Sequence, residues 1–141
     1  MLTTTALYAG ILALIALYLG SIPGRMRGRL KISVGDGGYP DMVLAMRRHA
    51  NFAEWVPLAI ILIAMLEING APKMAIHSFG AALVAFRICH AVGLQKDSIN
   101  VPTRIIGAGG TALLILAASI WLIVMFFGSS GNRVGDLTRL A

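Results

Sequence analysis

Long apolar runs separated by short polar segments make up most of the chain. A helix needs about 20 apolar residues to cross about 30 Å of hydrocarbon, because each residue adds about 1.5 Å. The pattern predicts four transmembrane helices, over residues 3–22, 41–67, 74–93 and 104–127. They form a single membrane domain over 1–127, and we expect a flexible tail over 128–141.

The second apolar run is too short to cross the membrane by itself. Residues 55–66 rise only about 18 Å as a helix, so this helix must begin earlier in the chain. Counting back about 20 residues from Glu67 places its inner boundary near Arg48. Asn51 and Glu54 are therefore predicted to lie within the membrane.

The composition leaves little surface for water. Of the 141 residues 57% are hydrophobic and 13% charged, and the mean hydropathy is +0.80, which excludes a soluble domain of this size. The fold class is therefore an all-α integral membrane protein. Because no nucleic-acid-binding motif accompanies the net charge of +6, we expect anionic lipid headgroups or an anionic ligand as partners and no nucleic acid.

Basic residues gather on one side of the predicted membrane. That side holds Arg25, Arg27, Arg29, Lys31, Arg47, Arg48, Lys96 and Arg104, and the other holds Lys73, Arg133 and Arg139. Because cytoplasmic loops are enriched in Lys and Arg, the basic loops are predicted to be cytoplasmic and both termini outside.

Polar residues form one stripe on each of two predicted helices. Arg47, Asn51 and Glu54 stand at i, i+4 and i+7, and Arg87 and His90 stand at i and i+3. Counted from the loop that joins the two helices, Glu54 and Arg87 are level, about 20 Å from it, and Asn51 is level with His90. We therefore expect a Glu54–Arg87 ion pair inside the bundle.

Together with Arg104, these stripes suit a ligand more than a metal. Arg47, Arg87, His90 and Arg104 give surplus positive charge, which favours an anionic ligand that also has an amine for Glu54 to accept. The alternative is structural: a buried ion pair, and an asparagine that bonds neighbouring helices. No pair of His or Cys residues has metal-ligand spacing, and no serine or cysteine triad is apparent.

These residues resemble a known family, the membrane-associated proteins in eicosanoid and glutathione metabolism (MAPEG), which includes the microsomal glutathione transferases. The likeness is strongest with its bacterial branch and covers residues 1–127. Three patterns carry it, namely Arg47-x-x-x-Asn51-x-x-Glu54 followed by Pro57, Arg87-x-x-His90, and Pro102-x-Arg104.

The resemblance implies a homotrimer that binds glutathione between subunits near the cytoplasmic face. Because the likeness is strongest with bacterial members, the implied location is the bacterial inner membrane. The residues implied for glutathione binding are Arg47, Asn51, Glu54, Arg87, His90, Arg25 and Arg27. Arg104 would be the catalytic residue, because a nearby cation favours the thiolate, which is the nucleophile. The implied activity is that of a glutathione transferase or peroxidase acting on lipophilic electrophiles in the lipid bilayer.

Three departures from the eicosanoid branch keep other functions open. Ala50 stands where that branch often has a second arginine, Leu94 where it has a tyrosine, and Ile105 where it has a serine. A non-catalytic lipid- or ligand-binding protein of the same family is the first alternative. A small multidrug transporter is the second, and it would require a proton-exchanging Glu54.

Overall fold

Four long helices make up the chain in the computed structural model, which describes residues 2–96 and 101–139, with side chains to residue 128. They are α1 (Thr3–Leu30), α2 (Pro40–Ile68), α3 (Lys73–Gly93) and α4 (Pro102–Arg139). Each has a stretch long and apolar enough to span a membrane. The predicted all-α four-helix membrane bundle is thereby confirmed.

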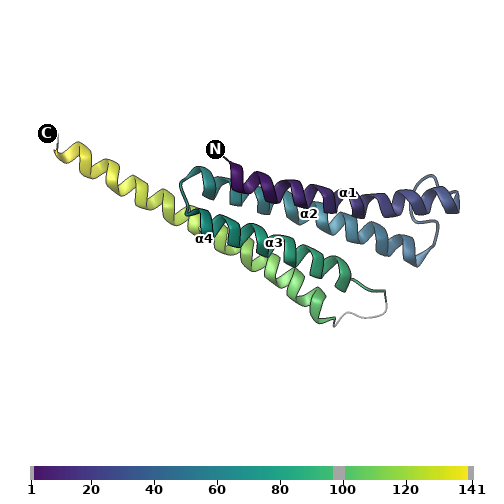
Figure 1. Ribbon diagram of the computed structural model, residues 1–141. Coiled ribbons are helices and arrows are strands. Elements are labelled where there is room, and N and C mark those ends of the chain that lie inside the picture. The colour runs from purple at the N-terminus through teal and green to yellow at the C-terminus, as the bar shows by residue number, and fades with distance from the viewer. Residues whose placement is uncertain (1, 97–100, 140–141) are drawn as a thin grey trace.

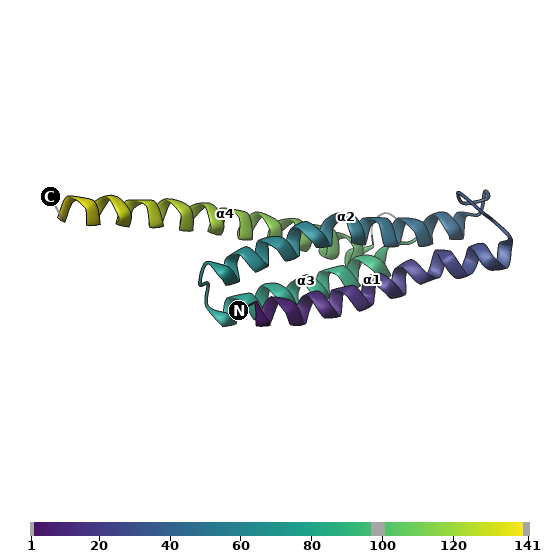
Figure 2. The ribbon, with the colours of Figure 1, turned by 90° about the horizontal axis from the view of Figure 1, so that it is seen from above.

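The helices run back and forth along a shared long direction (Figure 1). The α1–α2 loop, the end of α3 and the start of α4 lie toward one end, and the α2–α3 loop and the start of α1 lie at the other (Figures 1 and 2). The C-terminal part of α4 continues past that second end, away from the other helices. Both termini are therefore on the same side of the bundle.

Two helices are longer than predicted. α1 continues through Pro23 to Leu30, eight residues beyond the expected end, because a proline removes one hydrogen bond but the arginines that follow favour helix. It stops at Lys31, whose left-handed φ of 56° closes the last turn. α4 continues to Arg139, where we expected a tail from Gly128. Its glycines lower helix propensity without interrupting the backbone hydrogen bonds.

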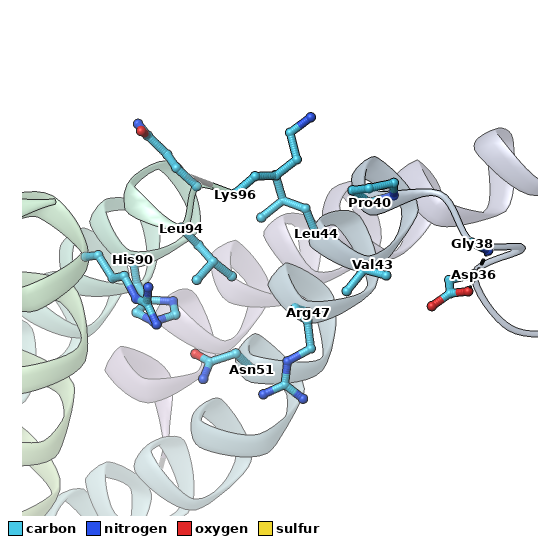
Figure 3. A pocket seen from close by; sticks show the side chains of 12 residues that line it. Asp36, Gly38, Pro40, Val43, Leu44, Arg47, Asn51, His90, Leu94 and Lys96 are labelled. Carbon is cyan, nitrogen blue, oxygen red and sulfur yellow. Dashed lines mark hydrogen bonds between the residues drawn. The ribbon is translucent and has the colours of Figure 1, made fainter. Parts of the chain in front are cut away.

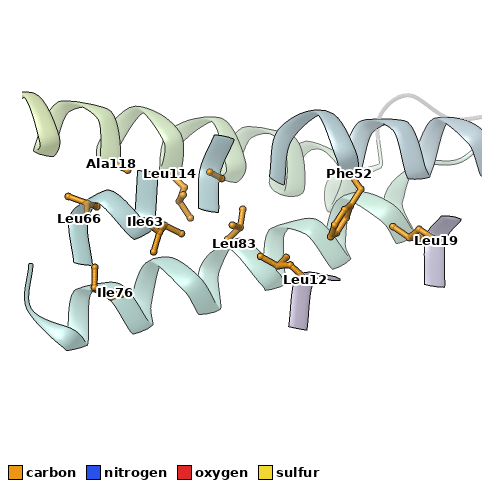
Figure 4. Packing of buried hydrophobic residues seen from close by; sticks show 10 residues of the cluster. Leu12, Leu19, Phe52, Ile63, Leu66, Ile76, Leu83, Leu114 and Ala118 are labelled. Atoms are coloured by element: carbon orange, nitrogen blue, oxygen red, sulfur yellow. The ribbon is translucent and has the colours of Figure 1, made fainter. Parts of the chain in front are cut away.

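The interior is a narrow column of side chains between the helices (Figure 4). On α3 the buried positions Ile76, Gly80, Leu83, Arg87 and His90 recur at intervals of four and three residues, which is one face of a helix. The outer surface is apolar, with Leu14 and Leu17 each 70% exposed. Such a surface suits lipid and not water.

A carboxylate from the end of α2 caps the start of α1. The Glu67 Oε1 and Oε2 atoms accept hydrogen bonds from the backbone N–H groups of Thr4 and Thr5, at 3.0 and 2.8 Å. The first turn of α1 contains no acidic residue, and no side chain of its own caps it. Glu67 therefore supplies both the acceptors and the negative charge that a helix N-terminus favours.

Replacing Glu67 by alanine should free the first turn of α1. Both amides lose their acceptor, so hydrogen exchange at Thr4 and Thr5 should accelerate, and the protein should lose about 1 kcal/mol of stability, as is typical of a lost cap. Exchange in the middle of α3 serves as the internal control. Equal protection of the Thr4 and Thr5 amides in Glu67→Ala and in the wild-type protein would contradict this capping role.

Candidate functional site

A cavity of about 520 Å³ opens at the end of the bundle that carries the α1–α2 loop (Figure 3). Its walls come from that loop, the first half of α2, the end of α3 and the start of α4. The lining residues are Asp36, Gly38, Pro40, Val43, Leu44, Arg47, Asn51, His90, Leu94, Gln95, Lys96 and Arg104. The volume is within the range usual for small-molecule sites.

The structure thus brings together four of the residues singled out in the sequence: Arg47, Asn51, His90 and Arg104. Within the described residues, Arg47 and Arg104 have no hydrogen-bond or ion-pair partner, so both guanidinium groups are available to an anion. Lys96, at the mouth, bonds Asp41 in an ion pair of 2.6 Å. The cavity is therefore rich in positive charge.

Arg87 lies behind the cavity and not in its wall. The side chain is 1% exposed, and its Nη2 atom donates a hydrogen bond to Asn51 Oδ1 at 2.6 Å. The guanidinium carbon also stands 5.6 Å from the centre of the Phe52 ring, a cation–π distance. Arg87 therefore holds Asn51, and Asn51 faces the cavity (Figure 3).

The predicted Glu54–Arg87 ion pair is wrong. Glu54 is exposed on the outer face of α2, while Phe52, two residues earlier, is 1% exposed and faces the core. Two residues turn a helix by about 200°, so the two side chains point in opposite directions. Counting residues from a loop compares depths in the membrane and leaves the rotation of the helix undetermined.

His90 is buried at the inner end of the cavity. Its side chain is 5% exposed, and Nδ1 has no hydrogen-bond partner. A buried ring nitrogen without a partner is costly unless something bonds it, so this atom is available to a ligand or to a water molecule.

Two glycines allow α4 to lie directly against α3 at this cavity. A Cβ atom on Gly107 would meet the backbone of Phe86 and His90, and one on Gly93 would meet the backbone of Arg104. Thr111 is fully buried one turn beyond Gly107, and its hydroxyl donates a hydrogen bond to the Gly107 carbonyl oxygen at 2.7 Å. This close packing brings Arg104 to the edge of the cavity beside His90.

Arg48, which the sequence placed at the inner membrane boundary and in no binding site, closes the end of α3. Its Nε and Nη2 atoms donate hydrogen bonds of 3.2 and 2.7 Å to the Leu94 carbonyl oxygen. A cation at a helix C-terminus satisfies a free carbonyl and complements the helix dipole. The bond joins α2 to the segment in which Leu94 lines the cavity.

Besides Arg87, three sequence-predicted residues lie outside the cavity of this chain. Glu54 and Arg25 are exposed, and the Arg27 Nη2 atom bonds the Gly35 carbonyl oxygen at 3.4 Å and the Met46 sulfur at 3.8 Å. Conversely, the structure adds Asp36, whose place in the cavity depends on the path of the α1–α2 loop. The sequence signals this loop only by its glycines.

Comparison with known proteins agrees with this architecture. The MAPEG family model matches residues 5–125. The chain is also similar to the inner membrane protein YecN of Escherichia coli strain K12 and to YecN of E. coli O6:H1 strain CFT073. Each is 32% identical over 118 residues, which cover 83% of this chain and 90% of the relative.

A methyl group at Gly107 should disturb the cavity, whereas one at Gly109 should not. A Cβ on Gly107 strikes the α3 backbone, while nothing lies within 4 Å of a Cβ on Gly109. Gly107→Ala should therefore lower the thermal unfolding midpoint in detergent. Gly109→Ala should keep or raise it, because alanine favours helix by about 1 kcal/mol. Equal midpoints for the two variants would contradict the close α3–α4 contact.

Proposed function

The chain belongs to the MAPEG family, and from this premise we propose that it is a glutathione-dependent transferase or peroxidase of the inner membrane that acts on lipophilic electrophiles. The observation that carries the proposal is the cavity that joins Arg47, Asn51, His90 and Arg104 at one end of a membrane bundle. The polar end would admit glutathione from the cytoplasm, with both termini on the outer side.

The residues present fit an anionic tripeptide thiol. Arg47 and Arg104 have no partner among the described residues, and guanidinium groups bind carboxylates well. The Asn51 side-chain oxygen accepts the hydrogen bond from Arg87, so its NH2 group is the part available to a ligand in the cavity. His90 Nδ1 offers a further unpaired nitrogen.

Arg104 would stabilise the reactive form of glutathione. A cation beside a thiol favours the thiolate, and the proton would pass to water at the open mouth. The sulfur then attacks an electrophilic carbon, a carbon–sulfur bond forms, and the leaving group departs with its bonding electrons. The protein supplies orientation and electrostatic stabilisation, each worth several kcal/mol, and no protein nucleophile is needed.

The exposed Glu54 of α2 supports association between subunits, for which the family resemblance implies a homotrimer. Glu54 lies on the outer face within the spanning part of α2, and a charge facing lipid there costs about 2.5–3.5 kcal/mol on insertion scales. A neighbouring subunit would supply polar partners and remove Glu54 from lipid. Glu54, Arg25 and Arg27 could then contribute to a site completed between subunits.

A non-catalytic lipid- or ligand-binding protein is the second candidate. Val43, Leu44 and Leu94 give the cavity an apolar side, and Leu94 replaces a polar group of the eicosanoid branch. Ligand binding without thiol consumption across a panel of electrophiles would favour this function. Proton-coupled transport ranks below both on family membership alone. The Glu54–Arg87 ion pair would also have argued against transport, but it is absent among the described residues.

Substituting Arg104 tests the catalytic proposal. Arg104→Ala should greatly reduce the thiolate absorbance of bound glutathione in the ultraviolet, and Arg104→Lys should retain part of it, because lysine keeps the charge. Lys73→Ala, at the opposite end of the bundle, is the control. An undiminished thiolate signal in Arg104→Ala would remove Arg104 from the mechanism.

The assembly is tested by the mass of the detergent-solubilised protein. Sedimentation corrected for bound detergent should give three chains of 14.9 kDa each. Glu54→Leu should shift the population if Glu54 bonds a neighbouring subunit. A wild-type protein that stays monomeric at all concentrations would contradict the trimer and leave the cavity of the single chain as the whole site.

A further inference from the structure

Asp36 contributes the only carboxylate among the described residues that line the cavity. It stands in the loop between α1 and α2, where Gly35, Gly37 and Gly38 all have positive φ values of 60–78°. Its Oδ1 atom accepts the Gly38 backbone N–H at 2.8 Å, drawn as a dashed line in Figure 3. The loop thus holds one carboxylate oxygen in place, and Oδ2 has no partner among the described residues.

We propose that Asp36 accepts the α-ammonium group of the thiol peptide and so selects for a free amino group. This inference rests on the proposed function, because it concerns how the same cavity would recognise glutathione. The sequence pattern assigned this role to Glu54, which the structure places on the outer face of α2.

The ammonium group of glutathione needs a negative charge beside it in this basic cavity. Glutathione carries two carboxylates and one ammonium besides its thiol. Arg47 and Arg104 suit the anionic groups, but an ammonium in a cavity that also holds Lys96 would be repelled unless an anion faced it. Asp36 is the carboxylate that lines this cavity.

Three other acceptors at the cavity are already engaged, and the Gln95 amide that also lines it carries no charge. Asn51 Oδ1 already accepts the Arg87 hydrogen bond, and the Leu94 carbonyl oxygen accepts two hydrogen bonds from Arg48. Asp41, near the mouth, is engaged with Lys96. Asp36 therefore combines a negative charge with an oxygen that is not used within the described chain.

The position of Asp36 also suits an elongated ligand. In Figure 3, Asp36 lies at one end of the cavity and His90 at the other, with Arg47 and Asn51 between them. A thiolate near Arg104, beside His90, would leave the γ-glutamyl end of the peptide to extend along Arg47 toward the loop. The ammonium belongs to that γ-glutamyl end.

The test is calorimetric titration of the solubilised wild-type protein and two variants with two ligands. The ligands are glutathione and glutaryl-cysteinylglycine, which differs only by lacking the amino group. Wild-type protein should prefer glutathione by about tenfold, as expected for a charged hydrogen bond. Asp36→Asn should lose that preference because its affinity for glutathione falls, while its affinity for the analogue stays the same. The loop should keep its conformation, since the asparagine oxygen can still accept the Gly38 N–H. Glu67→Gln, which removes a carboxylate at the end of α2 far from the cavity, should keep the preference.

The measured affinities separate a failure of the Asp36 role from a failure of glutathione binding. Equal affinity of the wild-type protein for both ligands would overturn the role of Asp36. A preference that is kept in Asp36→Asn, or lost equally in Glu67→Gln, would also overturn it. These outcomes would leave glutathione binding intact. Wild-type protein that binds neither ligand would overturn the proposed function, and this inference with it.

Discussion

A buried guanidinium in the middle of an apolar bundle is the constraint on which the arrangement of α2 and α3 depends. Arg87 is almost fully enclosed, and removing such a charge from water is costly unless hydrogen bonds and polarisable groups replace its hydration. The Asn51 oxygen and the Phe52 ring supply part of that replacement. Both come from one turn of α2, so the interaction sets the rotation of α2 against α3.

That rotation determines what the cavity contains. With Phe52 against the core, Asn51 stands at the edge of the buried face and Arg47 beyond it, so both reach the space between α2, α3 and α4. Glu54 is carried to the outside. On the other wall, Gly93 and Gly107 allow the start of α4 to touch α3, which brings Arg104 beside His90. The buried charge of Arg87 thus sets the α2 wall of the cavity, and the close helix contact at Gly93 and Gly107 sets the α4 wall.

Much of this architecture was predictable because membrane helices leave strong signals in sequence. Apolar length predicted four helices, and the spacing of Arg47, Asn51, His90 and Arg104 identified residues that the fold brings to one cavity. The direction of Glu54 was not predictable from depth, because rotation about a helix axis depends on which neighbours fill the opposite face. Asp36 was missed for a different reason: its position depends on a glycine-rich loop whose path follows from backbone conformation.

The membrane bundle, its basic cavity and its membership of the MAPEG family together support the proposal that glutathione binds between α2, α3 and α4. A crystal structure of the protein grown with glutathione tests this claim most directly. We predict the tripeptide in the cavity lined by Arg47 and Arg104, with its sulfur beside Arg104 and with Arg87 still bonded to Asn51. Glutathione bound elsewhere on the bundle, or an Arg87 side chain turned into the cavity to meet it, would contradict the account.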